Sequence, residues 1–578
     1  MQNRIIPIAS TTQDLRERKR RGPKGRRADA QALNEIRELL GTAPRQRDLL
    51  IEHLHRIQDR YQQLSAPHLA ALAEEMRLPQ TEVYEVASFY HHFDIVKEGE
   101  PSPQALTVRV CDGLACEMAG AGELLQRLPA ILGQEVRVLH APCIGRCEQA
   151  PAAVVGQNPV PNATVEKVAA AVKAGAVRHA PEEYIGLANY RSAGGYRLLG
   201  ECLSGQRDAE SVIATMEASG LRGLGGAGFP AGRKWRIVRS EPSPRLMAVN
   251  IDEGEPGTFK DRVYLESDPH RFIEGMLIAA WAVGIAAIYV YLRDEYHGCR
   301  ALLEQELARL QADPPAQGLP RIELRRGAGA YICGEESAMI ESIEGKRGMP
   351  RLRPPYVAQV GLFGRPTLEH NFETLYWVRD LVEKGPESFT SQGRHGRKGL
   401  RSFSVSGRVK QPGVKLAPAG ITIQELIDEY CGGMLDGHRF YAYLPGGASG
   451  GILPARMNDI PLDFDTLQPY GCFIGAAAVI VLSQHDTAVA AARNMMRFFR
   501  DESCGQCTPC RAGTAKALAL IEQPRWDQPL LAELSQVMRD ASICGLGQAA
   551  PNPVDCVVKY FPHELDAVAP SPSGRGRG

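Results

Sequence analysis

Apolar residues recur along the chain with two different periods, and the change of period predicts which segments are helices and which are strands. From Ala30 to Phe93 they return at helical spacing, as Leu54 and Ile57 do, which predicts a packed helical subdomain. Ser65 followed by Pro67 indicates a helix start within it. This segment shows no pattern typical of a ligand site.

The next segment combines strands with a helix. Leu106–Val110 alternates apolar and polar residues as a strand does, a helical stretch covers Gly122–Leu132, and strands follow at Val136–Leu139 and Ala152–Val155. These elements predict a small α/β unit. The polar, Gly/Ala-rich stretch around Lys173–Gly195 is typical of a linker.

A longer alternation of strands and helices follows, from Leu198 to Leu381. It includes strands at Leu246–Asn250 and Ala287–Leu292, with helices at Arg271–Val283 and Glu295–Leu310. Such alternation predicts a large α/β domain.

The last third of the chain changes pattern twice. Ser402–Gln484 has short strands with Gly/Pro turns such as Pro445-Gly446-Gly447, which predict a small mixed β domain. Thr487–Tyr560 is helical again and contains a cluster of cysteines. With the earlier segments, this predicts a multidomain α/β protein.

Composition and charge limit the environment and the partners. The 578 residues are 44% hydrophobic and 23% charged, which is ordinary for a soluble globular protein. The formal net charge is zero, and the longest apolar stretches, such as Gly275–Val290 and Phe473–Leu482, are too short or too rich in glycine and alanine to span a bilayer. We therefore expect no nucleic acid partner and no direct membrane contact.

Fourteen cysteines in a chain without an apolar signal region at its start indicate thiols or metal ligands in a reducing compartment. We expect this compartment to be the cytoplasm. The first 29 residues are rich in Lys and Arg, which predicts a flexible tail; a segment that orders against an acidic partner subunit is the alternative.

Four of the cysteines form two pairs, each placed after a predicted strand. Cys111-x4-Cys116 follows the first strand and Cys143-x3-Cys147 follows the next one. A binuclear iron–sulfur cluster takes two thiolates for each iron. Zinc favours Cys-x2-Cys knuckles, which neither pair is, and a reducing compartment disfavours disulfides. The spacing predicts a 2Fe–2S cluster.

A second set of four cysteines lies in the C-terminal helical segment. Cys504, Cys507 and Cys510 are separated by two residues each, and Cys544 lies further on. A close triplet with a distant fourth thiolate is typical of a 4Fe–4S cluster, whereas the triplet is unusual for zinc. The other six cysteines, which show no ligand spacing and are expected to be buried thiols, are Cys202, Cys299, Cys333, Cys431, Cys472 and Cys556.

Three loops of the large α/β segment combine glycines with charged residues. LRGLGGAGFPAGRKW at Leu221–Trp235 offers exposed N–H groups for a phosphate, although no strand leads into a GxGxxG turn. The loop after Leu246–Asn250 contains the carboxylates of Asp252, Glu253 and Glu255, and RGAGAYICGEE ends in two more. Carboxylates accept hydrogen bonds from ribose and repel a 2′-phosphate, which favours NAD over NADP.

These segments closely resemble the NADH- and FMN-binding subunit of respiratory complex I and the diaphorase subunits of NAD-reducing hydrogenases and NAD-dependent formate dehydrogenases. VRVCDGLACEMAG and HAPCIGRCEQAPA resemble the thioredoxin-like 2Fe–2S subunit of complex I. The resemblance implies a cofactor site for FMN and NAD with no catalytic side chain, because hydride passes from cofactor to cofactor.

The residues predicted to bind these cofactors fall into two groups. On the flavin side they are Gly223, Gly225, Lys234, Asn250, Asp252, Glu253, Gly334, Glu335, His370 and Asn371. On the nucleotide side they are Phe229, Lys234, Glu255, Tyr331, Glu336 and Tyr356, with Tyr356 where the family has an aromatic that stacks on adenine. The family has two adjacent asparagines where this chain has His370 and Asn371.

The resemblance also implies an order of domains and their folds. We predict a basic flexible tail (1–29), a helical N-terminal subdomain (30–97), a thioredoxin-like 2Fe–2S domain (98–176), a linker (177–197), an FMN- and NAD-binding α/β domain (198–399), a small β-grasp-like domain (400–485), a C-terminal helical 4Fe–4S bundle (486–566) and a flexible tail (567–578).

The fused arrangement and the phrase SVSGRVKQPGVKLAPAGITIQELIDEYCGG most resemble the β subunit of cytosolic NAD-dependent formate dehydrogenases. This implies electron transfer between iron–sulfur clusters and NAD through FMN, with a large partner subunit that holds further iron–sulfur clusters and a molybdenum or tungsten pterin. The alternatives are the diaphorase of a NAD-reducing hydrogenase or a complex I module. A non-catalytic electron-transfer scaffold, with His370 marking a decayed flavin site, is an alternative of another class.

Overall fold

The computed structural model describes residues 27–179, 181 and 183–566. This part of the chain forms two compact units, one ending at Pro103 and one beginning at Gln104, and each is described by itself. Most of the predicted basic tail and all of the predicted C-terminal tail lie outside the described residues.

The first unit is a small helical subdomain, as its periodicity predicts. Its main helices are α2 (Ala30–Leu40), α3 (Leu50–Tyr61), α4 (Ala66–Met76) and α5 (Gln80–Phe89). Ser65 caps α4, because its hydroxyl accepts a hydrogen bond from the His68 N–H at 3.3 Å. Ile36, Leu54 and Ile57 are fully buried between the helices.

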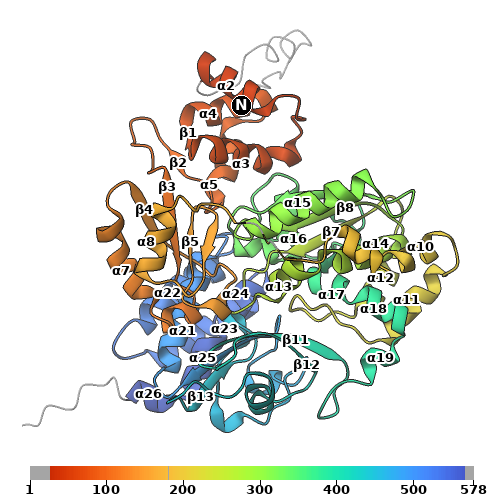
Figure 1. The fold of residues 1–578 in the computed structure, drawn as a ribbon. Coiled ribbons are helices and arrows are strands. Elements are labelled where there is room, and N and C mark those ends of the chain that lie inside the picture. Colours follow the sequence, from red (N-terminus) through yellow and green to blue (C-terminus); the bar gives the residue numbers. More distant parts are fainter. Residues whose placement is uncertain (1–26, 180, 182, 567–578) are drawn as a thin grey trace, which may run out of the picture. The chain divides into compact units, whose positions relative to one another are not determined.

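The second unit begins with a four-stranded sheet in the order β4-β3-β5-β6 (Figure 1). Its strands are β3 (Leu106–Cys111), β4 (Val136–Ala141), β5 (Ala153–Val155) and β6 (Asn158–Val160), with helices α6 (Leu114–Met118), α7 (Ala121–Leu132) and α8 (Val165–Lys173). Strands β3 and β4 are parallel, with Cys111 opposite Ala141. Both predicted cysteine loops therefore leave the sheet at the same edge.

The segment after α8 differs from the expected linker. It contains the helix α9 (Leu187–Ser192), and Tyr190 on this helix is buried. The Tyr190 hydroxyl donates a 2.6 Å hydrogen bond to the buried Glu274. The polar composition of the segment hid this helix, because its apolar contacts come from only two side chains, Leu187 and Tyr190.

The large α/β domain is built on a parallel sheet in the order β10-β7-β8-β9. The strands are β7 (Arg245–Ile251), β8 (Ile285–Leu292), β9 (Arg321–Arg326) and β10 (Thr367–Asn371). Its helices include α12 (Ala231–Ser240), α13 (Lys260–Ser267), α14 (Pro269–Val283), α15 (His297–Ala312), α16 (Glu336–Ile343) and α17 (Phe372–Tyr376) (Figure 1). The predicted strands and helices of this domain are confirmed, with small differences at their ends.

A five-stranded mixed sheet follows, in the order β12-β11-β15-β13-β14. It comprises β11 (Leu400–Gly407), β12 (Gly413–Pro418), β13 (Phe440–Leu444), β14 (Leu453–Pro454) and β15 (Ala478–Ser483). The chain then forms the C-terminal helices α21 (Ala488–Asp501), α22 (Thr508–Ile521), α23 (Gln528–Ala541), α24 (Gly545–Ala549) and α25 (Asn552–Tyr560). Thr487 caps α21 through its hydroxyl, which accepts from the Ala490 N–H.

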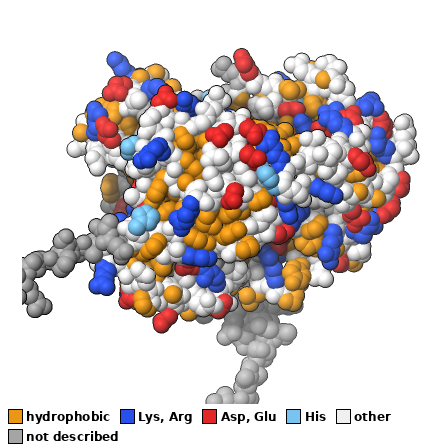
Figure 2. All heavy atoms as spheres, turned by 90° about the horizontal axis from the view of Figure 1, so that it is seen from below, with side chains coloured by type: hydrophobic (Ala, Val, Ile, Leu, Met, Phe, Trp, Pro, Cys, Tyr) orange, Lys and Arg blue, Asp and Glu red, His pale blue; other side chains and the backbone are white. Residues whose placement is uncertain are grey.

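The surface agrees with the balanced charge of the sequence. Figure 2 shows basic and acidic side chains mixed over one face, with hydrophobic side chains between them. Within the described ranges, no helix is long and apolar enough to cross a membrane.

Candidate functional site

The four N-terminal cysteines converge at the end of strands β3 and β4. The Cys143 and Cys147 sulfur atoms lie 3.3 Å apart, and the Cys111 thiol interacts with the thiols of Cys116 and Cys143. All four side chains are buried. Because the thiols form one continuous chain of contacts, the donor set fits a 2Fe–2S cluster.

The C-terminal cysteines converge in the same manner. Cys507 is the N-cap of α22 and Cys510 lies in its first turn, while Cys544 is the N-cap of α24. Gly547 brings the two segments together, since a Cβ on this residue would lie 2.8 Å from the Cys510 Cβ.

Burial raises the pKa of the Cys544 thiol to about 12 and that of Cys510 to about 11. These thiols are therefore protonated without metal, and cluster binding would release their protons. With Cys504 and Cys507 only half-buried beside them, the set fits a 4Fe–4S cluster.

Two asparagines lie at the edge of the large parallel sheet where its strands have their carboxyl ends. Asn250 at the end of β7 pairs in register with Asn371 at the end of β10. The Asn250 amide donates to the Gly334 carbonyl at 2.9 Å, and the Asn371 amide donates to the Asp261 carboxylate at 2.7 Å. In open α/β sheets, ligands bind beyond this edge of the strands.

Asp252, the next polar residue after β7, has an unsatisfied oxygen. Its Oδ2 is buried without a hydrogen-bond partner among the described atoms, 3.7 Å from where a Cβ on Gly334 would stand. Burial raises the pKa of Asp252 well above its usual range. A buried polar atom without a partner is uncommon, and a flavin bound at this edge would supply one.

The glycine-rich loop lies against the same edge. A Cβ on Gly225 would stand 2.9 Å from the Cβ of Asn371, so only glycine allows this approach. The Leu224 N–H donates to the Thr374 hydroxyl, and the Gly223 N–H donates to the Phe229 carbonyl. The loop is thus held by a hydrogen bond from its backbone to α17, which directly follows strand β10.

Neighbouring residues of α12, Lys234 and Trp235, contact neighbouring residues of β10, Glu369 and His370. The Lys234 ammonium donates to the Glu369 carbonyl at 3.0 Å and pairs with the Glu369 carboxylate at 3.1 Å. The His370 ring is buried, and its Nε2 accepts a 2.7 Å hydrogen bond from the Trp235 indole. The contact between His370 and flavin stays a prediction, because one nitrogen of the ring already accepts a hydrogen bond from Trp235.

On the predicted nucleotide side, Glu255 and Tyr331 are brought together. The Tyr331 hydroxyl donates to one Glu255 oxygen, and the Ser449 N–H donates to the other at 2.8 Å. The Tyr331 N–H in turn donates to Glu502 at 2.9 Å, next to the C-terminal cysteines.

Glu335 and Glu336 share a basic partner. Glu335 caps α16 by accepting from the Ser337 and Ala338 N–H groups, and Arg353 pairs with both glutamates. The Glu253 carboxylate is already engaged: it accepts from the Asp261 N–H and from the Tyr296 hydroxyl, both at 2.8 Å.

Two predicted aromatic residues are exposed. Phe229 is 39% exposed beside the Arg233 guanidinium, and Tyr356 is 56% exposed. Such rings are available to stack on a nucleotide base.

Several residues that hold this site were not identified from the sequence. Ser449 and Arg353 contact the glutamates predicted on the nucleotide side, and Trp235 contacts His370. The sequence around Ser449, GGASGG, resembles the other glycine loops and could have indicated that this segment belongs to the site. No sequence pattern indicated the pairing of Trp235 with His370.

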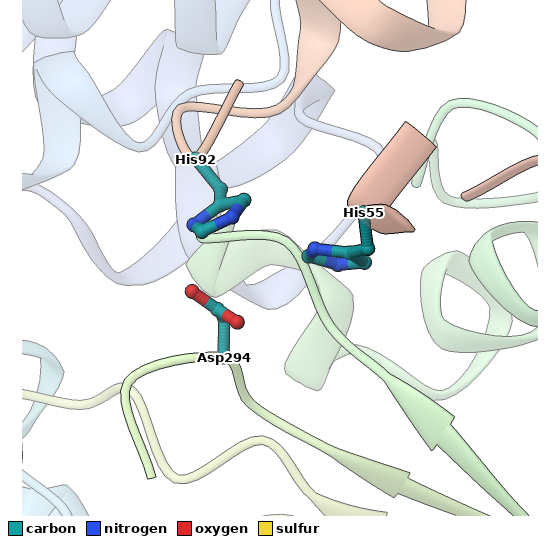
Figure 3. Close-up of side chains that lie close together, drawn as sticks. All are labelled: His55, His92 and Asp294. Carbon is teal, nitrogen blue, oxygen red and sulfur yellow. The ribbon is translucent and has the colours of Figure 1, made fainter. Parts of the chain in front are cut away.

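A histidine pair occurs in the first unit, apart from these residues in sequence. The centres of the His55 and His92 rings, both labelled in Figure 3, are 4.8 Å apart, and the centre of the Phe93 ring is 5.0 Å from that of His55. Within this unit they form part of the aromatic core.

Four family models match the chain. Residues 216–380 match the Nuo51 FMN-binding domain, 36–176 the thioredoxin-like [2Fe-2S] ferredoxin, 490–568 the NADH-ubiquinone oxidoreductase-F iron-sulfur binding region and 402–453 the SLBB domain. The predicted fold class and the predicted FMN, 2Fe–2S and 4Fe–4S groups are thereby confirmed.

Known proteins match over most of their length. A NADH-quinone oxidoreductase subunit of Rhizobium meliloti (strain 1021) is 39% identical over 395 residues, which are 66% of this chain and 94% of the relative. The mitochondrial NADH-ubiquinone oxidoreductase 51 kDa subunit of Neurospora crassa is 40% identical over 376 residues, 62% of this chain and 76% of the relative.

A chain of NAD+-reducing [NiFe]-hydrogenase is similar to this chain over most of its length. It is 33% identical, the alignment covers 92% of this chain and 94% of that chain, and the TM-score is 0.79. Fold and site together define an oxidoreductase subunit that holds a flavin and two iron–sulfur clusters. The chain belongs to the Nuo51 family of FMN-binding subunits, fused to a thioredoxin-like 2Fe–2S domain.

Proposed function

We propose that this chain exchanges electrons between NAD and its iron–sulfur clusters through FMN, as the diaphorase subunit of a cytoplasmic NAD-dependent formate dehydrogenase complex. The flavin role is supported best by the edge of β7 and β10, where a glycine loop approaches Asn371 and a buried Asp252 oxygen has no hydrogen-bond partner among the described residues. FMN, when bound, converts the two electrons of a hydride into single electrons that iron–sulfur clusters accept.

The residues of the edge bind and orient the flavin in this proposal. Gly223 and Gly225 let the backbone approach, while Asn250, Asp252 and Asn371 supply hydrogen-bonding groups. The other proposed flavin-side residues are Lys234, Glu253, Gly334, Glu335 and His370. The eight cysteines at positions 111, 116, 143, 147, 504, 507, 510 and 544 are the proposed cluster ligands.

The nucleotide is proposed to lie over the exposed side of the same loops. Phe229 and Tyr356 offer exposed rings for stacking, and Glu255, Tyr331 and Glu336 offer polar groups for ribose. The names of the relatives, which contain NADH or NAD+, support this part of the proposal.

Formate as the ultimate donor is supported by the resemblance of residues 404–433 to formate dehydrogenase β subunits. A large partner subunit with further iron–sulfur clusters and a molybdenum or tungsten pterin follows from this proposal. The diaphorase of a NAD-reducing hydrogenase is the second candidate, because the hydrogenase chain shares the fused arrangement over 94% of its length.

The test is to purify the complex that this chain forms in its own host and to supply formate or hydrogen as the electron donor. The proposal predicts reduction of NAD+ by formate, with released FMN and iron–sulfur absorbance in the same sample. Reduction of NAD+ by hydrogen alone would contradict the formate assignment and leave the flavin role intact. Iron–sulfur absorbance without FMN would instead indicate an electron-transfer scaffold.

A further inference from the structure

The loop of Cys143 and Cys147 lies directly against the loop that follows β7. The two cysteines pack with Ala115 and Phe259 in one buried cluster, and Phe259 belongs to the loop of Glu253. The contact is therefore made in the protein interior, where charges interact more strongly than in water.

Arg293, which directly follows β8, joins these two loops. Its Nη2 donates to the Cys143 carbonyl at 2.8 Å, and its Nη1 donates to the Glu253 carbonyl at 2.6 Å. Its Nε donates to the Glu295 carboxylate at 3.1 Å, and the guanidinium lies 5.1 Å from the centre of the Tyr296 ring. The residue is only 5% exposed, so solvent screens its charge weakly.

Neighbouring groups hold the cysteine loop in this place. Gly145 has a φ of +70°, and a Cβ on it would lie 2.3 Å from the Tyr296 hydroxyl. That hydroxyl donates to the Glu253 carboxylate, and Arg262 donates to the Gly145 carbonyl at 2.8 Å. The loop therefore cannot move away without breaking buried, charge-assisted hydrogen bonds.

We infer that Arg293 raises the reduction potential of the 2Fe–2S cluster while it positions the cluster loop against the loop of Glu253. The inference rests on the proposed ligation of that cluster by Cys143. Reduction adds a negative charge to the cluster, and a buried cation hydrogen-bonded to a ligand residue stabilises the reduced form. The negative charge of Glu295 partly offsets the positive charge of Arg293. Loss of the Arg293 guanidinium would therefore also leave the Glu295 carboxylate without its partner.

The test is a redox titration of the full chain, followed by the 2Fe–2S signal in electron paramagnetic resonance spectra. At a fixed ambient potential, Arg293→Gln should lower the ratio of reduced to oxidised cluster at least tenfold, which is about 59 mV for a one-electron couple. Arg293→Lys, which keeps the charge, should change the ratio much less. Glu295→Gln should raise the ratio, because it removes the offsetting charge.

Two controls separate this effect from general damage. Arg401→Gln removes another buried arginine, which pairs with Asp463. It should leave the ratio of reduced to oxidised 2Fe–2S cluster unchanged. The 4Fe–4S potential should also be unchanged in Arg293→Gln.

A further variant tests the ligation by itself. Cys143→Ser should abolish or alter the 2Fe–2S signal, and an unaltered signal would refute the proposed ligand rather than the role of Arg293. The role of Arg293 is refuted if Arg293→Gln assembles the cluster with an unchanged potential. It is equally refuted if Glu295→Gln fails to raise the ratio, a result that does not depend on the folding of the arginine variants.

Discussion

At the scale of single residues, Glu336 has the clearest expected effect on specificity. Its carboxylate pairs with Arg353 at 2.9 Å and remains partly exposed on the proposed nucleotide side of the site. In the proposed role, this carboxylate would accept hydrogen bonds from ribose and would repel the 2′-phosphate of NADPH. The Arg353 pairing reduces that repulsion without removing it.

We therefore expect Glu336→Gln to raise the rate with NADPH relative to NADH. Removal of one like-charge repulsion is worth about 1–3 kcal/mol, so the ratio of kcat/KM values should rise by at least ~5-fold. Glu383→Gln, which removes a salt-bridged glutamate of another helix, is the matched control and should leave the ratio unchanged. An unchanged ratio in Glu336→Gln would refute the role assigned to this glutamate.

His370 has an expected effect on stability rather than on specificity. Its buried ring accepts a hydrogen bond from Trp235, and burial lowers the pKa of His370 well below 6.5. Below pH 6.5 the unfolded chain binds a proton that the folded chain does not, so this residue reduces stability as pH falls. The loss approaches about 1.4 kcal/mol for each pH unit below 6.5.

His370→Asn should make the thermal midpoint less sensitive to acid between pH 7 and pH 5. The variant loses packing against Trp235, so its midpoint at pH 7 should be lower than that of the natural chain, but the decline toward pH 5 should be shallower. His91→Asn, a change at an exposed histidine, should leave the decline unaltered. Equal declines in all three proteins would contradict the buried, neutral state of His370.

At the scale of elements, the hydrophobic pattern predicted most of the fold. Strands β7 and β8 and helices α14 and α15 lie within a few residues of their predicted ends, because long apolar periods determine their positions. Helix α9 was missed since Tyr190 is buried by a distant partner, Glu274. Periodicity cannot reveal a contact between residues so far apart in sequence.

The candidate site was predictable only in part, for the same reason. Cysteine spacing and glycine loops are local signals, and they identified the cysteines and the loop of Gly225. The register that pairs Asn250 with Asn371 is a property of the sheet. The hydrogen bonds from Ser449 to Glu255 and from Trp235 to His370 likewise join segments that the sequence alone does not relate.

The close approach of the glycine loop to β10 gives a prediction at this scale. Gly225→Ala would place a Cβ 2.9 Å from the Asn371 Cβ, and such overpacking costs about 1–3 kcal/mol. We expect flavin to bind about tenfold more weakly, measured by fluorescence of released FMN after dialysis. Gly200→Ala, on helix α10 (Arg197–Leu203) with open space around it, should retain FMN fully. Full retention in Gly225→Ala would contradict the proposed flavin position.

At the scale of the second unit, the loops beyond the large parallel sheet contact one cysteine set and a residue close to the other. Phe259 packs against Cys143 and Cys147, and the Tyr331 N–H donates to Glu502, which lies two residues before Cys504. The loops proposed to bind flavin and nucleotide thus contact both cluster domains, which also contact each other, since the Asn494 amide donates to the Asp112 carbonyl at 2.8 Å. This arrangement suits a chain that moves electrons between a nucleotide and two clusters.

The most direct test of this account is the electron paramagnetic resonance spectrum of the anaerobic purified chain after addition of NADH. We predict signals from both the 2Fe–2S and the 4Fe–4S cluster, with Cys116→Ala losing the first and Cys507→Ala losing the second. The account would be contradicted if, in a sample that contains FMN, dithionite reduced the clusters and NADH did not. Electrons would then not pass from the nucleotide to the clusters by the proposed route.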